Sequence, residues 1–242
     1  MELSELIKGR IIAFEGADCC FKETNQKTFV KRLKEKLGKD NSSIIASKSF
    51  PQYESKSSYF VQNWLDGTYD RTDLKHNHRL VDTMYALDRY DYWNFRLYNN
   101  PSMLDHLHMK KYCFVFDRYC VSNAFYNPLY GGLPTKDDFE FDFDLCGNPK
   151  PDIVVLMYSS DPDVSIKLLE EKKNKDKNEL DIEFIRSVHE NIHHAIDQKL
   201  FAKANIRCIP VNILDKDGNI RNKKDIADEV YMRTIAALYD LK

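Results

Sequence analysis

A short stretch near the start of the sequence, FEGADCCFKET at residues 14–24, has most of what a phosphate-binding loop requires. It joins an apolar run to a segment with helical periodicity, and backbone N–H groups at the start of a helix favour an anion there. A lysine at this place would add a positive charge on the β- and γ-phosphates of a nucleotide. The stretch therefore predicts nucleotide binding by Gly16, Ala17, Cys19, Cys20, Phe21, Lys22, Glu23 and Thr24.

Two positions depart from the general pattern of such a loop. Phe21 replaces the glycine that normally precedes the lysine, and Glu23 replaces the serine or threonine that normally follows it. Because glycine lets the backbone turn close to a phosphate, Phe21 needs a negative φ or tolerated strain, with its ring pointing away from the phosphates. The Glu23 carboxylate could hold Mg²⁺, or it could repel the phosphates and stabilise the helix N-terminus instead. The loop alone is compatible with a working site and with an inactive one.

The rest of the chain alternates strand-like and helix-like segments. Five short runs rich in β-branched and aromatic residues are typical of buried parallel strands: residues 11–15, 43–50, 112–117, 152–158 and 206–213. Apolar residues recur with helical spacing over residues 24–37, 181–198 and 226–241. This alternation predicts an α/β fold with a doubly wound, five-stranded parallel sheet flanked by helices. Ligands of such sheets bind beyond the carboxyl ends of the strands, where residues 14–24 lie.

Composition narrows the class of protein further. A chain of 242 residues predicts one domain over residues 1–242, and a formal net charge of −2 argues against nucleic-acid binding. No apolar run is long enough to cross a bilayer, so no membrane association is expected. The six cysteines form no C-x-x-C pair, which favours reduced thiols in the cytoplasm.

Two polar segments interrupt the alternating pattern. Residues 127–148 contain proline, glycine and acidic residues, and we expect an insertion loop there. The run EEKKNKDKNEL at residues 170–180 is highly charged, which is typical of a solvated helix end.

Four motifs together resemble the thymidylate kinases, the P-loop nucleoside monophosphate kinases that make dTDP from dTMP and ATP. The motifs are FEGADCCFKETNQ (14–26), SFPQY (49–53), YALDRY (85–90) and FDRYCVSNAFY (116–126), the last followed by NPKPDIVVLMYSSDPDVSIKLL (148–169). Their order and spacing carry the resemblance, which extends to about residue 198. It implies a P-loop kinase fold, ATP and Mg²⁺ as cofactors, dTMP and ATP as substrates, and a homodimer.

The resemblance also implies roles for single residues. Lys22 would hold the β- and γ-phosphates and Asp117 would help position Mg²⁺. Arg118 would clamp the acceptor phosphate, a task for which its planar fork is suited. Arg89 matches a second arginine on the monophosphate, and Tyr85, one turn earlier on the same helix face, matches an aromatic that stacks on thymine. The implied catalytic residues are Lys22, Asp117 and Arg118; the implied substrate-binding residues are Asp18, Phe50, Tyr53, Tyr85, Arg89, Arg118, Ser122 and Tyr126; the candidate metal ligands are Glu23 and Asp117.

The chain departs from the family pattern at further places. Tyr53 stands where the family has an arginine after Phe-Pro, and Cys19 stands where some members carry a catalytic arginine. Other members supply a basic group from a lid, which we expect at about residues 170–180. A lysine there could serve, because phosphoryl transfer depends mainly on positioning and charge neutralisation. The candidates are Lys172, Lys173, Lys175 and Lys177.

Three hypotheses remain open from the sequence. The leading one is an ATP:dTMP phosphotransferase. Tyr53 motivates the second, a broader deoxynucleoside or deoxynucleoside-monophosphate kinase. Phe21 and Glu23 motivate the third, a nucleotide-binding protein without transfer activity.

Overall fold

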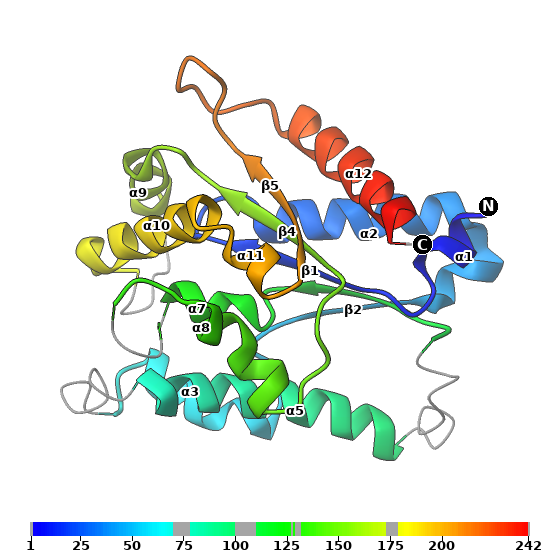
Figure 1. Ribbon diagram of the computed structural model, residues 1–242, viewed down its shortest axis with the longest axis horizontal. Helices are drawn as coiled ribbons and strands as arrows, with labels where there is room; N and C mark the ends of the chain where they lie inside the picture. Colours follow the sequence, from blue (N-terminus) through cyan, green and yellow to red (C-terminus); the bar gives the residue numbers. More distant parts are fainter. Residues whose placement is uncertain are drawn as a thin grey trace.

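Five parallel strands form one sheet in the order β2-β3-β1-β4-β5 (Figure 1). The computed structural model describes residues 2–69, 78–99, 110–126, 128, 132–172 and 179–241, without the side chains of residues 40 and 95–99. Each predicted apolar run forms a strand, which confirms the doubly wound sheet. The strands are β1 (Ile11–Gly16), β2 (Ile45–Ser49), β3 (Cys113–Asp117), β4 (Ile153–Tyr158) and β5 (Arg207–Asn212).

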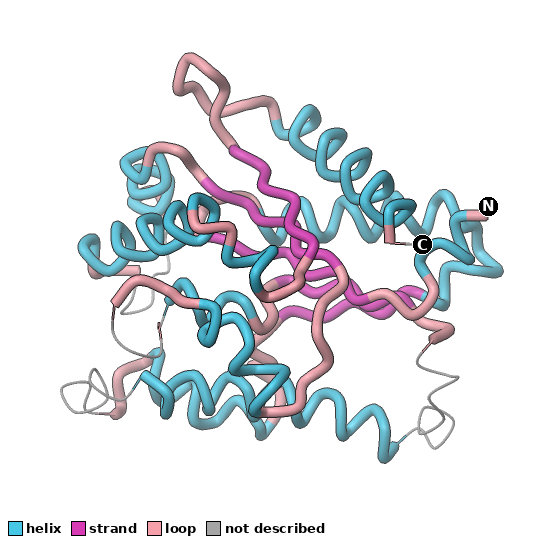
Figure 2. Tube along the Cα trace, in the orientation of Figure 1, coloured by secondary structure: helices cyan, strands magenta, loops and turns pink. Residues whose placement is uncertain are grey.

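Helices cover both faces of the sheet, so the strands are enclosed between two helical layers (Figure 2). Every residue of β1 is buried, as expected for a central parallel strand. On one face lie α1 (Leu3–Ile7), α2 (Lys22–Asn41) and α12 (Lys223–Asp240). The opposite face carries α3 (Tyr59–Leu65), α5 (His78–Asn99), α7 (Val121–Tyr126), α10 (Ile182–Asp197) and α11 (Leu200–Lys203), while α9 (Pro162–Glu170) packs on α10. Two short 3₁₀ helices, η1 (Ser42–Ile44) and η2 (Lys56–Ser58), flank β2 and α3.

An aromatic layer fills the space between α5 and β3. The rings of Trp93 and Phe114 lie 4.8 Å apart, and the rings of Phe116 and Tyr119 stack at 4.9 Å. Trp93 Nε1 donates to the Tyr119 hydroxyl at 2.9 Å, and that hydroxyl donates to the Pro149 carbonyl at 2.7 Å. Because these rings are buried and hydrogen-bonded, they give α5 a fixed position relative to the carboxyl end of β3.

The expectation of an insertion loop over residues 127–148 is wrong for residues 136–145. These residues form the helix α8 (Lys136–Glu140) and the π-helical turn η4 (Phe141–Leu145). Thr135 and Asp138 make a reciprocal capping box that starts α8, and Phe139 is fully buried with its ring 4.9 Å from that of Phe201. Two of the acidic residues that suggested a loop are buried: Asp138 caps α8, and Asp142 forms an ion pair with Arg89. Residues 127 and 129–131 lie outside the described part of the chain.

Two other expectations concern the chain as a whole. Across the described ranges, no helix is both long and apolar enough to cross a membrane, and all six cysteines are free thiols. The assignment of residues 1–242 to one domain stays a prediction.

Candidate active site

The carboxyl ends of three neighbouring strands meet at one edge of the sheet. Phe14 of β1 pairs with Asp117 of β3, and Asp117 also pairs with Ser49 of β2. The chain leaves β1 toward α2 on one face and leaves β3 toward α7 on the other (Figure 1). A crevice therefore opens between β1 and β3, where a doubly wound sheet binds its ligand.

The loop after β1 adopts a left-handed backbone at three positions. Gly16 has φ +129°, and a Cβ at that residue would lie 1.8 Å from the Met157 carbonyl oxygen, so only glycine fits. Cys19 and Phe21 both have φ +59°, which costs a residue with a side chain about 1–2 kcal/mol. Of the two possibilities for Phe21, a negative φ or tolerated strain, the loop adopts the second.

The Phe21 side chain is accommodated by the last helix. Its ring packs against the hydrophobic core, with Lys223 Nζ of α12 5.3 Å from the ring centroid. Phe21 also serves as the N-cap position of α2, which begins at Lys22. The benzyl group at the place of the usual glycine is thus held by contacts outside the loop.

Two joined cavities lie over the crevice. We call the first the inner pocket. All eight of the predicted substrate-binding residues line it: Asp18, Phe50, Tyr53, Tyr85, Arg89, Arg118, Ser122 and Tyr126. The outer cavity, about 670 Å³, is lined by the loop after β1 and by Ser49, Asp117, Lys172 and Glu179. The residues that line both are Asp18, Phe50, Pro51, Tyr53 and Arg118. Four residues of the inner pocket were not predicted: Pro51, Leu65, Tyr119 and Asn123.

Five of the eight predicted loop residues line the outer cavity, and the other three are buried. Cys19, Phe21, Lys22, Glu23 and Thr24 line the outer cavity. Gly16, Ala17 and Cys20 are buried beneath the loop, and the Cys20 thiol lies 3.4 Å from the Ser165 hydroxyl of α9.

Arg118 stands at the junction of the two cavities. Its φ is +59°, and its backbone N–H donates to the Phe14 carbonyl at 2.9 Å. Its guanidinium donates to Asp18 Oδ1 and lies 5.0 Å from the Tyr126 ring, while the Tyr126 hydroxyl donates to Asp18 Oδ2 at 2.9 Å. Burial alone would raise the pKa of Asp18, but the Arg118 and Lys22 cations hold it well below its usual range. Asp18 is therefore ionised at neutral pH.

Lys22 is held inside the loop. Only 7% of the residue is exposed, and its ammonium donates to the Ala17 carbonyl at 2.6 Å and lies 3.7 Å from Asp18 Oδ1. Burial lowers the pKa of Lys22, and the nearby Arg118 cation lowers it further. The cations Lys22 and Arg118 thus lie together at this end of the crevice, and the carboxylates of Asp18 and Asp117 face them. The two cations are suited to an anionic ligand.

Asp117 is the carboxylate suited to a metal ion. Its Oδ1 is buried and has no hydrogen-bond partner among the described residues, while Ser49 hydrogen-bonds to the carboxylate. Burial raises the pKa of Asp117. Within the described ranges, no group of three or more Asp, Glu, His or Cys side chains could hold a metal by itself. Mg²⁺ commonly takes one or two carboxylates with phosphate oxygens and waters, so Asp117 fits as its protein ligand beside a triphosphate.

The other candidate metal ligand points elsewhere. The Glu23 side chain is 62% exposed and forms an ion pair with Lys27, one turn further along α2. This pair lies on the solvated face of the helix, so Glu23 is at the rim of the outer cavity.

Arg89 lies at the far end of the inner pocket. It is 2% exposed and does not line the outer cavity. Its Nε donates to Asp142 Oδ1 at 3.2 Å, one terminal nitrogen donates to Asp142 Oδ2, and the other donates to the Tyr119 carbonyl at 3.2 Å. Arg89 thus lines the inner pocket alone, whereas Arg118 lines both cavities.

Glu15 is a supporting residue that the sequence reasoning missed. It is fully buried, and Oε1 accepts from the backbone N–H groups of Tyr119 and Val121, both at 3.0 Å, while Oε2 accepts from the Ser122 hydroxyl. Burial raises the pKa of Glu15. These bonds fix the turn that carries Arg118 and Ser122. A lone carboxylate in an apolar strand was the available signal, because such a group must be hydrogen-bonded.

Asp88 supports the other wall of the inner pocket. This buried residue of α5 accepts from the Gln52 backbone N–H at 2.8 Å and from the Ser57 hydroxyl at 2.6 Å. The Gln52 side-chain amide in turn donates to the Asp88 carbonyl at 2.9 Å. Asp88 therefore ties the SFPQY segment to the helix that carries Tyr85 and Arg89.

One of the predicted lid lysines lies within the described part of the chain. Lys172 donates to Glu179 Oε1 at 2.6 Å and lines the outer cavity. Lys173, Lys175 and Lys177 lie outside the described residues, so the expectation for them stays a prediction.

A parallel sheet with a phosphate-binding loop, and a bridging arginine that borders both the loop cavity and a second pocket, is the arrangement of a P-loop phosphotransferase. The sequence model of the thymidylate kinase family matches residues 14–207. The chain therefore belongs to the thymidylate kinase family, whose members phosphorylate dTMP, and it is a dTMP kinase.

Comparison with solved structures agrees with the fold. A thymidylate kinase from Candida albicans is 15% identical, with a TM-score of 0.61 over 96% of this chain and 94% of that chain. A thymidylate kinase from Ehrlichia chaffeensis is 18% identical, with a TM-score of 0.59 over 95% of this chain and 98% of that chain. No curated protein sequence matches the chain.

Proposed function

We propose that the chain transfers the γ-phosphoryl group of ATP to dTMP, with dTMP in the inner pocket and the triphosphate in the outer cavity. One observation carries this proposal. The inner pocket, lined by the eight predicted substrate residues, joins at Arg118 the cavity that contains Lys22 and Asp117. An acceptor phosphate at Arg118 would therefore face a donor phosphate at Lys22.

In phosphoryl transfer the protein mainly positions the two substrates and neutralises the charge of their phosphates. Lys22 would hold the β- and γ-phosphates from within the loop, and Arg118 would exchange its bond to Asp18 for the acceptor phosphate. Mg²⁺ bound at Asp117 would neutralise charge on the triphosphate and orient it. Lys172 borders the same cavity and would add a further positive charge near the γ-phosphate.

The polar groups at the far end of the inner pocket suit a thymine ring. Asn123 Nδ2 donates to the Asp82 carbonyl at 3.3 Å, which leaves its carbonyl oxygen as the acceptor for the pocket. Arg89 offers N–H donors beside it. Thymine presents a carbonyl acceptor at O4 and a donor at N3, whereas cytosine presents a donor amine at N4. We therefore assign Arg89 to the base rather than to the acceptor phosphate, with Tyr85 stacking on the ring.

The sugar would lie between the base and Arg118. Asp18 would accept a hydrogen bond from the 3′-hydroxyl. Tyr126, whose hydroxyl donates to Asp18 at 2.9 Å, would crowd a ribose 2′-hydroxyl. The two residues together favour a deoxynucleotide.

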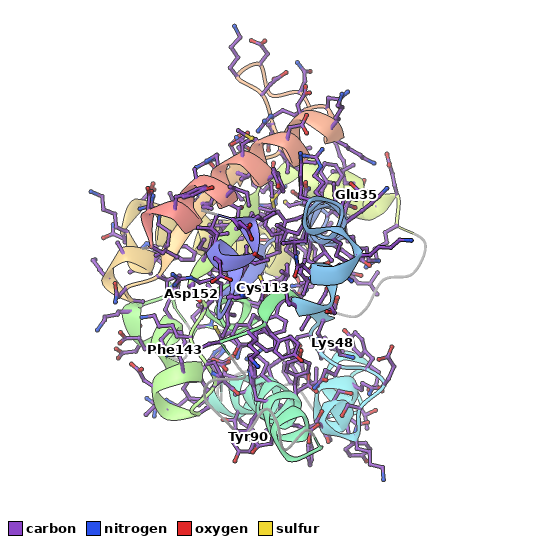
Figure 3. All side chains as sticks on the ribbon, turned by 90° about the vertical axis from the view of Figure 1, so that its right-hand side faces the viewer. Glu35, Lys48, Tyr90, Cys113, Phe143 and Asp152 are labelled. Carbon is purple, nitrogen blue, oxygen red and sulfur yellow. The ribbon has the colours of Figure 1, made fainter. Side chains whose placement is uncertain are left out.

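We propose a cytoplasmic homodimer that pairs through α5. Leu80, Leu87 and Tyr90 are 41%, 52% and 49% exposed and recur at a spacing that puts them on one helix face. Tyr90 lies on the outer side of α5, away from the sheet (Figure 3). Exposed apolar side chains on one helix face suit a second copy of the chain. The free cysteines support a reducing compartment.

The deciding experiment mixes the purified chain with ATP, Mg²⁺ and each deoxynucleoside monophosphate and follows ADP release. We expect turnover of dTMP, with dCMP rejected. Lys22→Ala should abolish turnover. Lys27→Ala is the matched control, since that lysine is on the same helix with a side chain 69% exposed. Turnover of thymidine but not dTMP would favour the broader kinase, and dTMP binding without ADP release would identify a non-catalytic protein.

A further inference from the structure

We propose that Asp142 is a positioning residue that makes Arg89 a reader of the uncharged base. This inference rests on the proposed function, because it concerns the binding of dTMP in the inner pocket. It gives a role to η4, part of the segment between α7 and β4.

The Arg89–Asp142 pair is built for a fixed geometry. The side chains are 2% and 1% exposed, and the carboxylate accepts from two nitrogens of the guanidinium. The third bond, to the Tyr119 carbonyl at 3.2 Å, comes from another element. A guanidinium has five N–H donors, so two remain for a ligand. Their direction is set by the three bonds already made.

Asp142 is itself held on its other side. Asn148 Nδ2 donates to Asp142 Oδ1 at 2.7 Å and to the Ala86 carbonyl at 3.0 Å. The Asn148 backbone N–H donates to the Asp142 carbonyl at 3.1 Å. Ala86 lies on α5 one turn before Arg89. The chain of bonds therefore runs from α5 through Asn148 and Asp142 back to α5, and it locks the arginine in place.

The charge of Asp142 decides what Arg89 can bind. A lone buried guanidinium would attract the acceptor phosphate and compete with Arg118 for it. Paired with Asp142, it presents N–H donors without a net positive charge. Such a pair suits a neutral carbonyl group such as thymine O4, and removing one partner of a buried pair leaves the other uncompensated. Asp142 thus keeps the phosphate at Arg118 and the base at Arg89.

The test measures dTMP and ATP affinities by calorimetry for Asp142→Asn and for Asp138→Asn. The first variant keeps the shape of the side chain but replaces an acceptor with a donor facing Arg89. We expect its Kd for dTMP to rise roughly tenfold to a hundredfold, the effect of losing a charged hydrogen bond. The Kd for ATP should change by no more than about twofold, because the donor site is independent. Asp138→Asn removes a buried carboxylate of α8 that caps the helix, so it should lower stability and leave the dTMP Kd unchanged.

Two further variants keep the test decisive if Asp142→Asn fails to fold. Asn148→Ala removes the support of Asp142 and should weaken dTMP binding in the same direction, by a few-fold. Asp142→Glu keeps the carboxylate and should recover part of the affinity lost in Asp142→Asn. An unchanged dTMP Kd in folded Asp142→Asn or Asn148→Ala would overturn the role of Asp142 while leaving the kinase intact. A wild-type chain that binds no dTMP would overturn the proposed function as well.

Discussion

Replacing Phe21 with glycine tests whether the loop binds a triphosphate despite its benzyl group. Phe21 occupies the position where glycine is usual, with φ +59° and its ring on the core and Lys223. If the ring lies clear of the phosphates, its removal leaves ATP binding unchanged. We therefore expect the KM for ATP to stay within about threefold of wild type, less than the effect of one hydrogen bond.

The expected stability change is the sum of opposing contributions. Glycine removes a left-handed strain of about 1 kcal/mol. It also removes half-buried ring surface worth about 1 kcal/mol and an exposed cation–π contact worth about 0.5–1 kcal/mol. Phe21→Gly should therefore be less stable than wild type by about 0.5–1 kcal/mol. Phe21→Ala loses the same contacts but keeps the strain, so it should fall by about 2 kcal/mol.

Thermal unfolding of the three proteins measures both contributions, and a coupled ADP assay measures the KM for ATP. A difference of about 1 kcal/mol between the glycine and alanine variants corresponds to about 2–4 °C in Tm for a chain of this size. An alanine variant as stable as the glycine variant would refute the left-handed backbone at this position. A tenfold fall in the KM for ATP in Phe21→Gly would show that the ring obstructs the donor site.

Three further predictions concern the loop and its surroundings. Glu23→Thr should keep or raise activity without changing the Mg²⁺ concentration needed for half-maximal rate, because Glu23 pairs with Lys27 at the surface; a tenfold rise in that concentration would make it a metal ligand. Gly16→Ala should yield no folded protein by circular dichroism, since its Cβ would lie 1.8 Å from the Met157 carbonyl oxygen. Burial lowers the pKa of His189 to about 4, against about 6.5 in the unfolded chain, so the unfolded state gains the proton and stability falls as the pH drops through this window. As the pH drops from about 6.5 to about 4, the urea midpoint of unfolding should therefore fall less in His189→Gln than in wild type. An equal fall of the midpoint in both proteins would contradict a buried, neutral His189.

The fold could be predicted because its signals are local. The three central strands β1, β3 and β4 are mainly apolar, and strands separated by helical segments indicate a parallel sheet. The first loop and the FDRY segment each follow a strand directly, so their place at the carboxyl edge needed no knowledge of packing. Residues 136–145 differ from the predicted loop because Asp138 caps a helix and Asp142 pairs with the buried Arg89, and neither contact is visible in the local sequence.

The sequence by itself determined the sheet, the position of the phosphate-binding loop and eight of the twelve residues that line the inner pocket, since these follow from short contiguous motifs. Only the tertiary structure decided the pairings that give those residues their roles. Arg89 meets Asp142 across 53 positions, and Arg118 meets Asp18 across 100. No periodic pattern specifies which buried carboxylate faces which guanidinium. That choice depends on where packing brings separate elements together, and it places Arg89 in the inner pocket alone while Arg118 borders both cavities.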